Sequence, residues 1–443
     1  MRTAHSAPPG SYDAVIIGAG FTGLAAAYEF ARAGRRVLVL ERDDAIGGLA
    51  GSFSVGGAEL ERFYHHWFTN DVHVMDLIRE LGTRDSVLLR PTRTGMYYAH
   101  NFFKLSSPLD VLRFTPLSFV DRLRLGLMVL RARNVKDWRD LEHRSASAWL
   151  REIGGDNVYR VVWEPLLKGK FGKYADEVSA VWFWNKLKLR GGSRAKGGGE
   201  QLAYYRGGFA QLARHLAAAA EKLGAEIRTS AAVERLLVAE GAIVGVVAAG
   251  AEIRAPTVVA TAPLPLIADL VTTHVPADFT ARLRRIHYLA NVCMVLELDR
   301  SLSQTYWLNV NDPGFPFVGV IEHTNFEPPE TYRGRHIVYL SKYLEEDDPL
   351  FAMDADAMLA FSLPHLNVMF PAFERSWVLA HHVWKARFSQ PIVEKDYSSL
   401  IPPADTPLRG LHIASMAQIS PEDRGTNYAI REGRAIGKRL AAT

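Results

Sequence analysis

Residues 13–41 read DAVIIGAGFTGLAAAYEFARAGRRVLVLE, and the pattern of this stretch decides the fold class. Short apolar runs at 13–17 and 36–40 predict two buried parallel strands, and the alanine-rich run at 24–33 predicts a helix between them. The turn before the helix has the form G-x-G-x-x-G, and Glu41 ends the second strand. This order of strand, glycine turn, helix, strand and acid is the dinucleotide-binding fingerprint of an α/β domain.

The glycine turn provides the contacts that a dinucleotide needs. Gly18 allows the tight turn, Gly20 lets the backbone approach a pyrophosphate, and Gly23 lets the helix pack closely on the strand. Unpaired N–H groups and the dipole at the helix N-terminus attract the phosphates, and the Glu41 carboxylate can accept hydrogen bonds from the ribose hydroxyls. The predicted cofactor-binding residues of this stretch are Gly18, Gly20, Phe21, Thr22, Gly23 and Glu41.

A second glycine cluster follows the acid after a short turn. A plain NAD-binding domain would continue into another helix here, but the chain at 47–51 is GGLAG. An irregular, glycine-rich backbone suits a segment that passes close to a second part of a long cofactor. The cluster therefore favours FAD over NAD, and it adds Gly47, Gly48, Leu49 and Ala50 to the predicted binding residues.

Composition excludes several classes of protein. The 443 residues are 48% hydrophobic and 23% charged, and the net charge of +4 is too small to indicate nucleic-acid binding. The single cysteine excludes an intramolecular disulfide. No metal site is expected, because no cysteine or acid stands at ligand spacing beside the adjacent histidines at 65 and 66. Neither a signal peptide nor a membrane-spanning run is recognised, so we expect a cytoplasmic protein, with a position at the inner face of the membrane left open.

Two stretches resemble a known flavoprotein superfamily. The sequences ERDDAIGG at 41–48 and FYHHWFTND at 63–71 are similar to those of flavin amine oxidases, protoporphyrinogen oxidases, phytoene-type desaturases and UDP-galactopyranose mutases. The resemblance implies non-covalently bound FAD, adds Arg42 to its binding residues, and places the segment at 63–71 beside the flavin ring. Adjacent histidines in an extended chain point in opposite directions. His66 matches the histidine of the superfamily, so it is the candidate catalytic residue and a cofactor contact.

The C-terminal stretch resembles the second FAD motif of this superfamily. A strand is predicted at 410–415 and a helix after 425, whose N-terminal N–H groups would stabilise the charge of the reduced flavin. The superfamily usually has Gly-Asp after the strand, where this chain has Ser415, and amine oxidases have an aromatic cage residue where it has Gly425. The resemblance adds Val233, Ala262, Ser415, Gly425, Thr426, Asn427 and Tyr428 to the predicted cofactor-binding residues.

The motifs imply an α/β protein with a Rossmann-type FAD-binding domain and an inserted α+β substrate domain, made of an antiparallel sheet plus helices. We predict FAD-binding parts at 10–90, 207–268 and 385–443, and substrate-domain parts at 91–206 and 269–384. The segment at 161–180 resembles the substrate domain of protoporphyrinogen oxidases. A dense aromatic group begins in this segment and continues after it, and we expect most of its members to pack in the core and one or two to line an apolar substrate channel: Trp163, Phe171, Trp182, Phe183 and Trp184.

The helix predicted at 117–133 is basic and amphipathic. Five large apolar residues recur at helical spacing, with arginines between and beyond them: Phe119, Val120, Leu123, Leu127 and Leu130. Two interpretations stay open. The apolar residues pack on the core of the substrate domain, or they meet anionic lipid at a membrane surface.

The resemblance predicts an FAD-dependent oxidoreductase that moves a hydride between a substrate carbon and flavin N5. The aromatic-rich middle and the basic helix favour a small-molecule substrate that is apolar or lipid-linked. Two alternatives stay open: an isomerase similar to UDP-galactopyranose mutase that acts on a sugar, and a non-catalytic FAD-binding partner protein. The sequence indicates neither the electron acceptor nor the oligomeric state.

Overall fold

A five-stranded parallel sheet carries the glycine turn in the computed structural model, which describes residues 11–105, 107–192 and 200–443. The strand order is β10-β2-β1-β14-β20, and the strands are β1 (Ala14–Ile17), β2 (Val37–Leu40), β10 (Glu226–Arg228), β14 (Thr257–Ala260) and β20 (Leu411–Ile413). Successive side chains on a strand point to opposite faces, so Val15 and Ile16 belong to different hydrophobic cores. The sheet is buried on both faces, as parallel sheets usually are.

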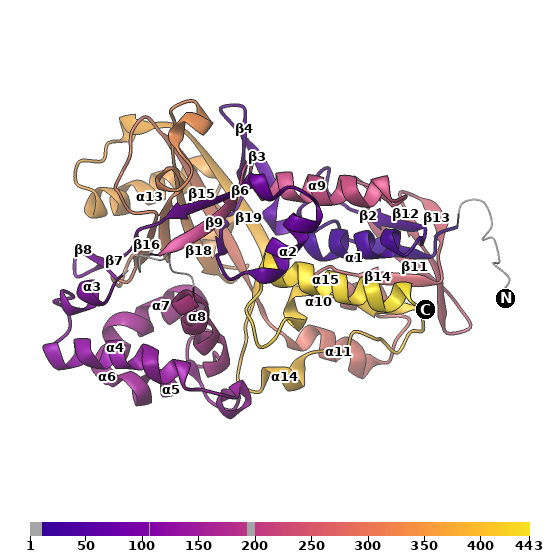
Figure 1. Cartoon of the computed structure of the whole chain (residues 1–443), viewed down its shortest axis with the longest axis horizontal. Coiled ribbons are helices and arrows are strands. Elements are labelled where there is room, and N and C mark those ends of the chain that lie inside the picture. Colours follow the sequence, from indigo (N-terminus) through magenta and orange to yellow (C-terminus); the bar gives the residue numbers. More distant parts are fainter. Residues whose placement is uncertain (1–10, 106, 193–199) are drawn as a thin grey trace.

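Helices cover one face of this sheet and a small antiparallel sheet covers the other. The helices on the Ile16 face are α1 (Phe21–Arg32), α9 (Phe209–Lys222) and α15 (Thr426–Ala441), which lie together in Figure 1. The opposite core contains β11 (Val233–Ala239), β12 (Ala242–Ala248), β13 (Ala251–Arg254), α10 (Leu264–Val271) and α11 (Ala277–Arg285). The α/β fold class is therefore as predicted.

A seven-stranded sheet forms the core of the second lobe. Its order is β19-β15-β18-β17-β16-β7-β8, with bounds β7 (Thr94–Tyr98), β8 (Asn101–Lys104), β15 (Tyr288–Leu298), β16 (Trp307–Val310), β17 (Gly319–Glu322), β18 (His336–Leu344) and β19 (Val378–Pro391). Neighbouring strands are antiparallel except β16 and β7, which pair in parallel. The sheet is thus mixed at one pair rather than wholly antiparallel. The predicted domain boundary at 384 falls inside β19, and the domain limits themselves stay a prediction.

Helices flank this sheet on both sides in Figure 1. On one side lie α12 (Pro349–Ala352) and α13 (Ala355–Met369), and on the other a helical lobe of α3 (Pro108–Leu112), α4 (Phe119–Arg133), α5 (Ala146–Gly154), α6 (Asp156–Val158), α7 (Glu164–Phe171) and α8 (Ala180–Gly192). The shorter elements are α2 (Val72–Glu80), α14 (Tyr397–Leu400), β3 (Ser52–Val55), β4 (Ala58–Glu61), β5 (Trp67–Phe68), β6 (Val87–Pro91) and β9 (Gln201–Tyr205). Among the described residues, no helix combines the length and apolar character needed to cross a membrane.

Helix α4 forms where the sequence predicts a helix, but its buried side differs from the first of the two interpretations. Its core contacts come from Leu125, Met128 and Ala132. The five apolar residues that defined the amphipathic pattern, from Phe119 to Leu130, are exposed. The interpretation that these five residues pack on the core is therefore wrong.

Candidate flavin-binding site

The three glycines of the turn have the geometry that a dinucleotide site requires. Gly18 has a φ of +104°, a conformation that side chains rarely adopt. A Cβ at Gly23 would lie 1.9 Å from the carbonyl oxygen of Gly18, so only glycine lets α1 approach the turn this closely. A Cβ at Gly20 would meet no atom within 4 Å. Gly20 therefore faces open space, at the place where a pyrophosphate is expected.

The second glycine cluster lies directly beside this turn. The Gly47 N–H donates to the Ala19 carbonyl at 2.9 Å, and a Cβ at Gly48 would lie 3.4 Å from the Gly20 Cα. The structure thus brings residues 47–50 next to the glycine turn, although Gly47 lies 24 positions after Gly23 in the sequence. A ligand that extends past Gly20 would meet both segments.

Glu41 is buried directly after β2 and forms hydrogen bonds with the loops around it. Its carboxylate accepts hydrogen bonds from the N–H groups of Ala19 (2.8 Å) and Asp43 (3.0 Å). The Ala231 N–H donates to the Glu41 carbonyl at 2.7 Å, which brings the start of β11, and with it Val233, to this end of the sheet. Arg42 is exposed and pairs with Asp43 at 3.3 Å. The chain thus assembles Glu41 and Val233 where the adenosine is expected.

Helices α1 and α15 lie side by side and run in the same direction. A Cβ at Gly433 would lie 2.2 Å from the Thr22 carbonyl oxygen, and one at Gly437 would lie 2.7 Å from that of Ala26. Moving four residues along α15, from Gly433 to Gly437, also moves the contact four residues along α1, from Thr22 to Ala26. The two helices are therefore parallel, and both N-termini lie at the same end. Neither N-terminus is capped by a side chain or carries an acid in its first turn. Two positive dipole ends are therefore available to an anionic cofactor.

The first residues of α15 have different roles from one another. Gly425 is the exposed N-cap, and the Thr426 hydroxyl accepts a hydrogen bond from Trp67 Nε1 at 2.6 Å. Asn427 is buried, and its side-chain oxygen accepts from the Val74 N–H at 3.0 Å, which joins α15 to α2. Tyr428 is half-buried beside His73. The Asn427 side chain therefore connects two helices. Contacts with the cofactor at this place would come from backbone groups and from the residues next to Asn427.

The remaining predicted contacts lie at the carboxyl ends of the next two strands. Ala262 follows β14, where the Thr261 N–H donates to the Ile17 carbonyl at 3.0 Å. Ser415 follows β20, is buried, and its N–H donates to Gln418 Oε1 at 2.7 Å. Ligands of open α/β sheets bind at this edge of the sheet. Both residues are thus on the same edge as the glycine turn.

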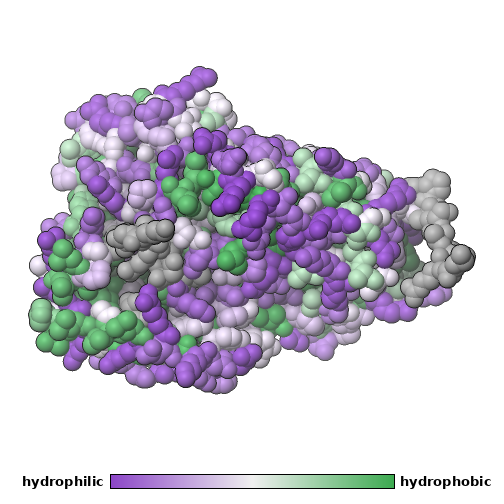
Figure 2. All heavy atoms as spheres, in the orientation of Figure 1, coloured by the Kyte–Doolittle hydropathy of each residue, from purple (hydrophilic) through white to green (hydrophobic). Residues whose placement is uncertain are grey.

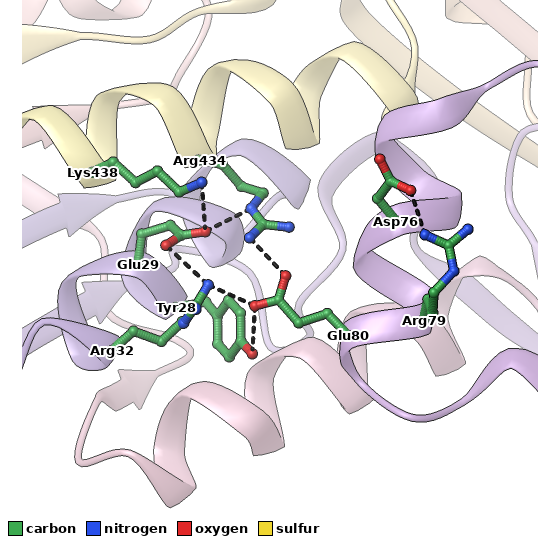
Figure 3. Close-up of polar contacts among 8 residues, drawn as sticks. All are labelled: Tyr28, Glu29, Arg32, Asp76, Arg79, Glu80, Arg434 and Lys438. Atoms are coloured by element: carbon green, nitrogen blue, oxygen red, sulfur yellow. Dashed lines mark hydrogen bonds and ion pairs between the residues drawn. The ribbon is translucent and has the colours of Figure 1, made fainter.

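An ion-pair network around the buried Glu29 holds α1, α15 and α2 together (Figure 3). Glu29 of α1 is 5% exposed and accepts from Arg434 Nε of α15 at 2.6 Å. The same guanidinium bonds Glu80 of α2 at 2.7 Å, and Arg32 bonds Glu80 at 2.6 Å. Buried carboxylates require such partners. The network fixes the relative positions of the two helix N-termini.

The two adjacent histidines point in different directions, as expected for an extended chain. His65 packs against Phe209 at the start of α9, and burial lowers the pKa of its imidazole to about 4. His66 Nδ1 lies 3.1 Å from the Tyr306 hydroxyl, and its ring meets Trp307 edge-on. His66 thus lies where β5 meets the seven-stranded sheet. Its catalytic role stays a prediction.

Four charged residues meet where α7, α8 and the start of α15 approach the seven-stranded sheet. This junction cluster consists of Lys170, Lys186, Asp423 and Arg424. Lys186 Nζ lies 2.6 Å from Asp423, and Arg424 donates to the Tyr343 hydroxyl of β18 at 3.0 Å. Burial alone would raise the pKa of Asp423, but Lys186, Lys170 and Arg424 together hold it well below its usual range.

Lys170 is the member of the junction cluster whose protonation responds to pH near neutrality. Its ammonium lies 4.6 Å from the centre of the Trp182 ring. Burial, reinforced by Lys186 and Arg424, lowers the pKa of Lys170 to about 7, against the opposing attraction of Asp423. A cation in an apolar, already positive site is disfavoured.

We expect acetylation of Lys170 by acetic anhydride, followed by peptide mass spectrometry on the full chain, to rise with pH around a midpoint of about 7. Asp423→Asn removes the carboxylate that favours the protonated form, so it should move this midpoint lower. A midpoint near 10.4, the value of an ordinary lysine, would contradict the assigned environment.

The model of the flavin-containing amine oxidoreductases matches residues 21–436. The chain belongs to this family. Among its relatives is a putative flavin-containing monoamine oxidase, AofH, of Mycobacterium tuberculosis, which is 29% identical over 247 residues and covers 53% of this chain and 54% of that protein. The chain thus spans about half the length of the curated relatives it matches.

Solved structures show the same fold over nearly the whole length. A putative protoporphyrinogen oxidase from Exiguobacterium sp. 255-15 aligns over 97% of this chain and 98% of its own, with a TM-score of 0.77 and 15% identity. A reduced UDP-galactopyranose mutase aligns over 98% and 94%, with a TM-score of 0.74 and 13% identity. The resemblance inferred from the sequence motifs is confirmed for family and fold.

The residues present fit the flavin that the family carries. The open space at Gly20, the adjoining backbone of 47–50 and the uncapped N-termini of α1 and α15 suit the diphosphate and ring of FAD. Cys293 is completely buried in β15, and burial raises the pKa of its thiol, which opposes covalent attachment through it. Non-covalent FAD, as predicted, is the cofactor that this site would hold.

Glu61 is a buried acid that no sequence motif indicates. Glu61 is completely buried and accepts hydrogen bonds from the Tyr204 hydroxyl (2.7 Å) and the Phe209 N–H (2.7 Å) at the start of α9. A Cβ at Gly208 would lie 2.9 Å from this carboxylate. The Gly-Gly pair at 207–208 indicates that another part of the chain approaches this backbone closely, but it does not indicate that this part is Glu61.

Proposed function

We propose that this protein is an FAD-dependent oxidoreductase that moves a hydride between a substrate carbon and flavin N5. The observation that carries the proposal is the parallel packing of α1 and α15, which directs two uncapped helix N-termini to one end of the molecule. Such an arrangement favours a negatively charged cofactor and the anionic form of its reduced ring. When bound, the flavin supplies the redox chemistry, and the chain binds and orients the reactants.

We further propose an apolar or lipid-linked substrate that reaches the junction cluster. The aromatic side chains of Trp182 and Tyr343 flank Lys170 there, at 4.6 and 5.2 Å from ring centre to Nζ. Trp182 Nε1 and Asn185 Nδ2, one helical turn apart on α8, are buried without a hydrogen-bond partner among the described residues. Unsatisfied buried donors are costly, so a ligand oxygen at this place would relieve them.

The first experiment is made on the purified holoprotein. Its flavin is photoreduced without oxygen, air is admitted, and the return of the oxidised absorbance is followed. Binding of one FAD per chain and reduction by a donor substrate support the proposal. A protein that neither carries nor can be reconstituted with flavin would refute it. Fast reoxidation directs the substrate search to amines and porphyrinogens, and slow reoxidation to lipid-linked donors.

A second candidate is a flavin-dependent isomerase similar to UDP-galactopyranose mutase. The observation in its favour is the junction cluster, in which Lys170, Lys186 and Arg424 face the single carboxylate of Asp423. An excess of cations suits a nucleotide-sugar diphosphate. Incubation of the photoreduced holoprotein with UDP-galactopyranose distinguishes the two functions, because an isomerase forms the furanose without net reoxidation of the flavin. Turnover in either assay excludes a non-catalytic partner protein.

A further inference from the structure

Large apolar side chains gather on one exposed part of the helical lobe and on the neighbouring strand β8. Of the thirteen that are exposed in the part of the chain that the structure describes, eight lie on β8, α3 and α4, with exposed fractions of 42–63%. These eight, here called the apolar surface, are Phe102, Leu109, Leu112, Phe119, Val120, Leu123, Leu127 and Leu130. Figure 2 shows hydrophobic residues gathered over this part of the molecule, at the lower left. Contiguous exposure of this kind marks an interaction site.

The apolar surface is not needed to hold the lobe together. Helix α4 already has a buried side, formed by Leu125, Met128 and Ala132. The Trp184 indole of α8 donates to the Ala132 carbonyl at 2.9 Å, which fixes that side against α8. The exposed residues lie outside these contacts. They are therefore available to a partner outside the fold.

The charge around the apolar surface is strongly positive. The stretch at 101–134 contains six basic residues, Lys104, Arg113, Arg122, Arg124, Arg131 and Arg133, and two acidic ones, Asp110 and Asp121. Asp121 is 4% exposed and already bonded to Arg124. Backbone carbonyls hold two of the arginines on the surface, since Arg122 donates to Leu112 and Arg131 donates to Ile153.

We propose that the apolar surface docks on an anionic lipid bilayer, with α4 lying in the plane of the membrane interface. An exposed apolar helix face flanked by basic residues has the chemistry of an interfacial helix. A second copy of this chain fits less well, because two such faces would bring their arginines together. The contact is peripheral. It places α8, which carries Trp182 and Lys186, next to the docked helix, and this position suits the lipid-linked substrate proposed above, although docking does not depend on it.

Co-sedimentation of the holoprotein with vesicles tests the proposal. Wild-type protein is expected to bind vesicles of phosphatidylcholine and phosphatidylglycerol, and to bind less as salt rises, because exposed charges are screened. The double variant Leu123→Ser, Leu127→Ser should lose about tenfold or more in binding, since two apolar side chains no longer enter the lipid. Arg113→Gln with Arg133→Gln should weaken binding only to the anionic vesicles.

The matched control is the double variant Leu223→Ser, Leu379→Ser. These leucines are 46% and 55% exposed, but Leu223 is the C-cap of α9 and Leu379 lies on β19, so both are outside the apolar surface. Unchanged binding by this control and unchanged thermal melting of all variants support the proposal. Equal loss in both leucine variants, or binding to pure phosphatidylcholine as tight as to anionic vesicles, overturns it. The proposal is also overturned if the wild-type protein does not bind vesicles but forms a dimer, and the double variant Leu123→Ser, Leu127→Ser dissociates that dimer.

Discussion

Replacing Gly20 by valine is expected to weaken FAD binding severely while the apoprotein stays folded. A Cβ at this position meets no protein atom within 4 Å, and the φ of −72° is accessible to any residue, so the fold tolerates the side chain. The same side chain occupies the space in which the pyrophosphate has to approach the backbone. We expect FAD affinity to fall by about 100-fold or more, the effect of an overpacked site that cannot relax.

Calorimetric titration of the apoprotein with FAD measures this loss, and circular dichroism checks the fold. Gly126→Val is the matched control, because a Cβ there also meets nothing within 4 Å but lies on α4, away from the site. Gly23→Ala should behave differently from both, since its Cβ would lie 1.9 Å from the Gly18 carbonyl and displace α1 itself. It should lose stability and FAD together. Full FAD binding by Gly20→Val would contradict the predicted path of the cofactor.

The second large effect is expected from Arg434→Met, which leaves Glu29 of α1 without its main partner. Breaking a buried ion pair by removing one member typically costs about 3–5 kcal/mol. We expect the lower end, about 3 kcal/mol, because Arg32 and Lys438 still face Glu29 at 3.4 and 3.9 Å. Urea unfolding of the apoprotein, followed by tryptophan fluorescence, measures the change in the free energy of unfolding. FAD binding should weaken as well, since α15 loses its fixed position beside α1.

The exposed pair Asp76–Arg79, drawn beside the network in Figure 3, provides the control. Its two side chains are 60% and 62% exposed, so Arg79→Met should change the free energy of unfolding by no more than about 1 kcal/mol. Combining Arg434→Met with Glu29→Gln should recover part of the loss, because no unpaired buried charge remains. Equal effects of Arg434→Met and Arg79→Met would show that the network around Glu29 does not hold the helices together.

The nucleotide-binding elements were predictable because their requirements are local. A tight turn, a close approach and a buried strand each leave a signal within a few residues, so Gly18, Gly20, Gly23 and Glu41 were identified with the elements that carry them. The second glycine cluster was predicted to pass close to another part of the cofactor, and in the structure its backbone lies beside the first cluster. Family resemblance then extended the prediction to α15.

Long-range partnerships were not predictable in this way. Glu29 and Arg434 are separated by 405 positions, and Glu61 and Phe209 by 148, so no periodicity or spacing connects them. The junction cluster draws its charges from α7, α8 and the segment just before α15, which meet only when both lobes are packed. Gly433 and Gly437 lie four apart on a helix, and this spacing indicates that another element packs closely against it. The spacing does not indicate which helix that element is.

The sequence by itself determined where the chain turns around a dinucleotide and which segments form strands and helices, because backbone conformation follows from nearby residues. The periodicity at 117–133 likewise established a helix. Which of its sides is buried depended on α5 and α8, which pack against Leu125, Met128 and Ala132 and leave Phe119 and Leu127 exposed. Burial, pairing of charges and the meeting of two helix N-termini are properties of the packed chain, so they appeared only when distant segments were brought together.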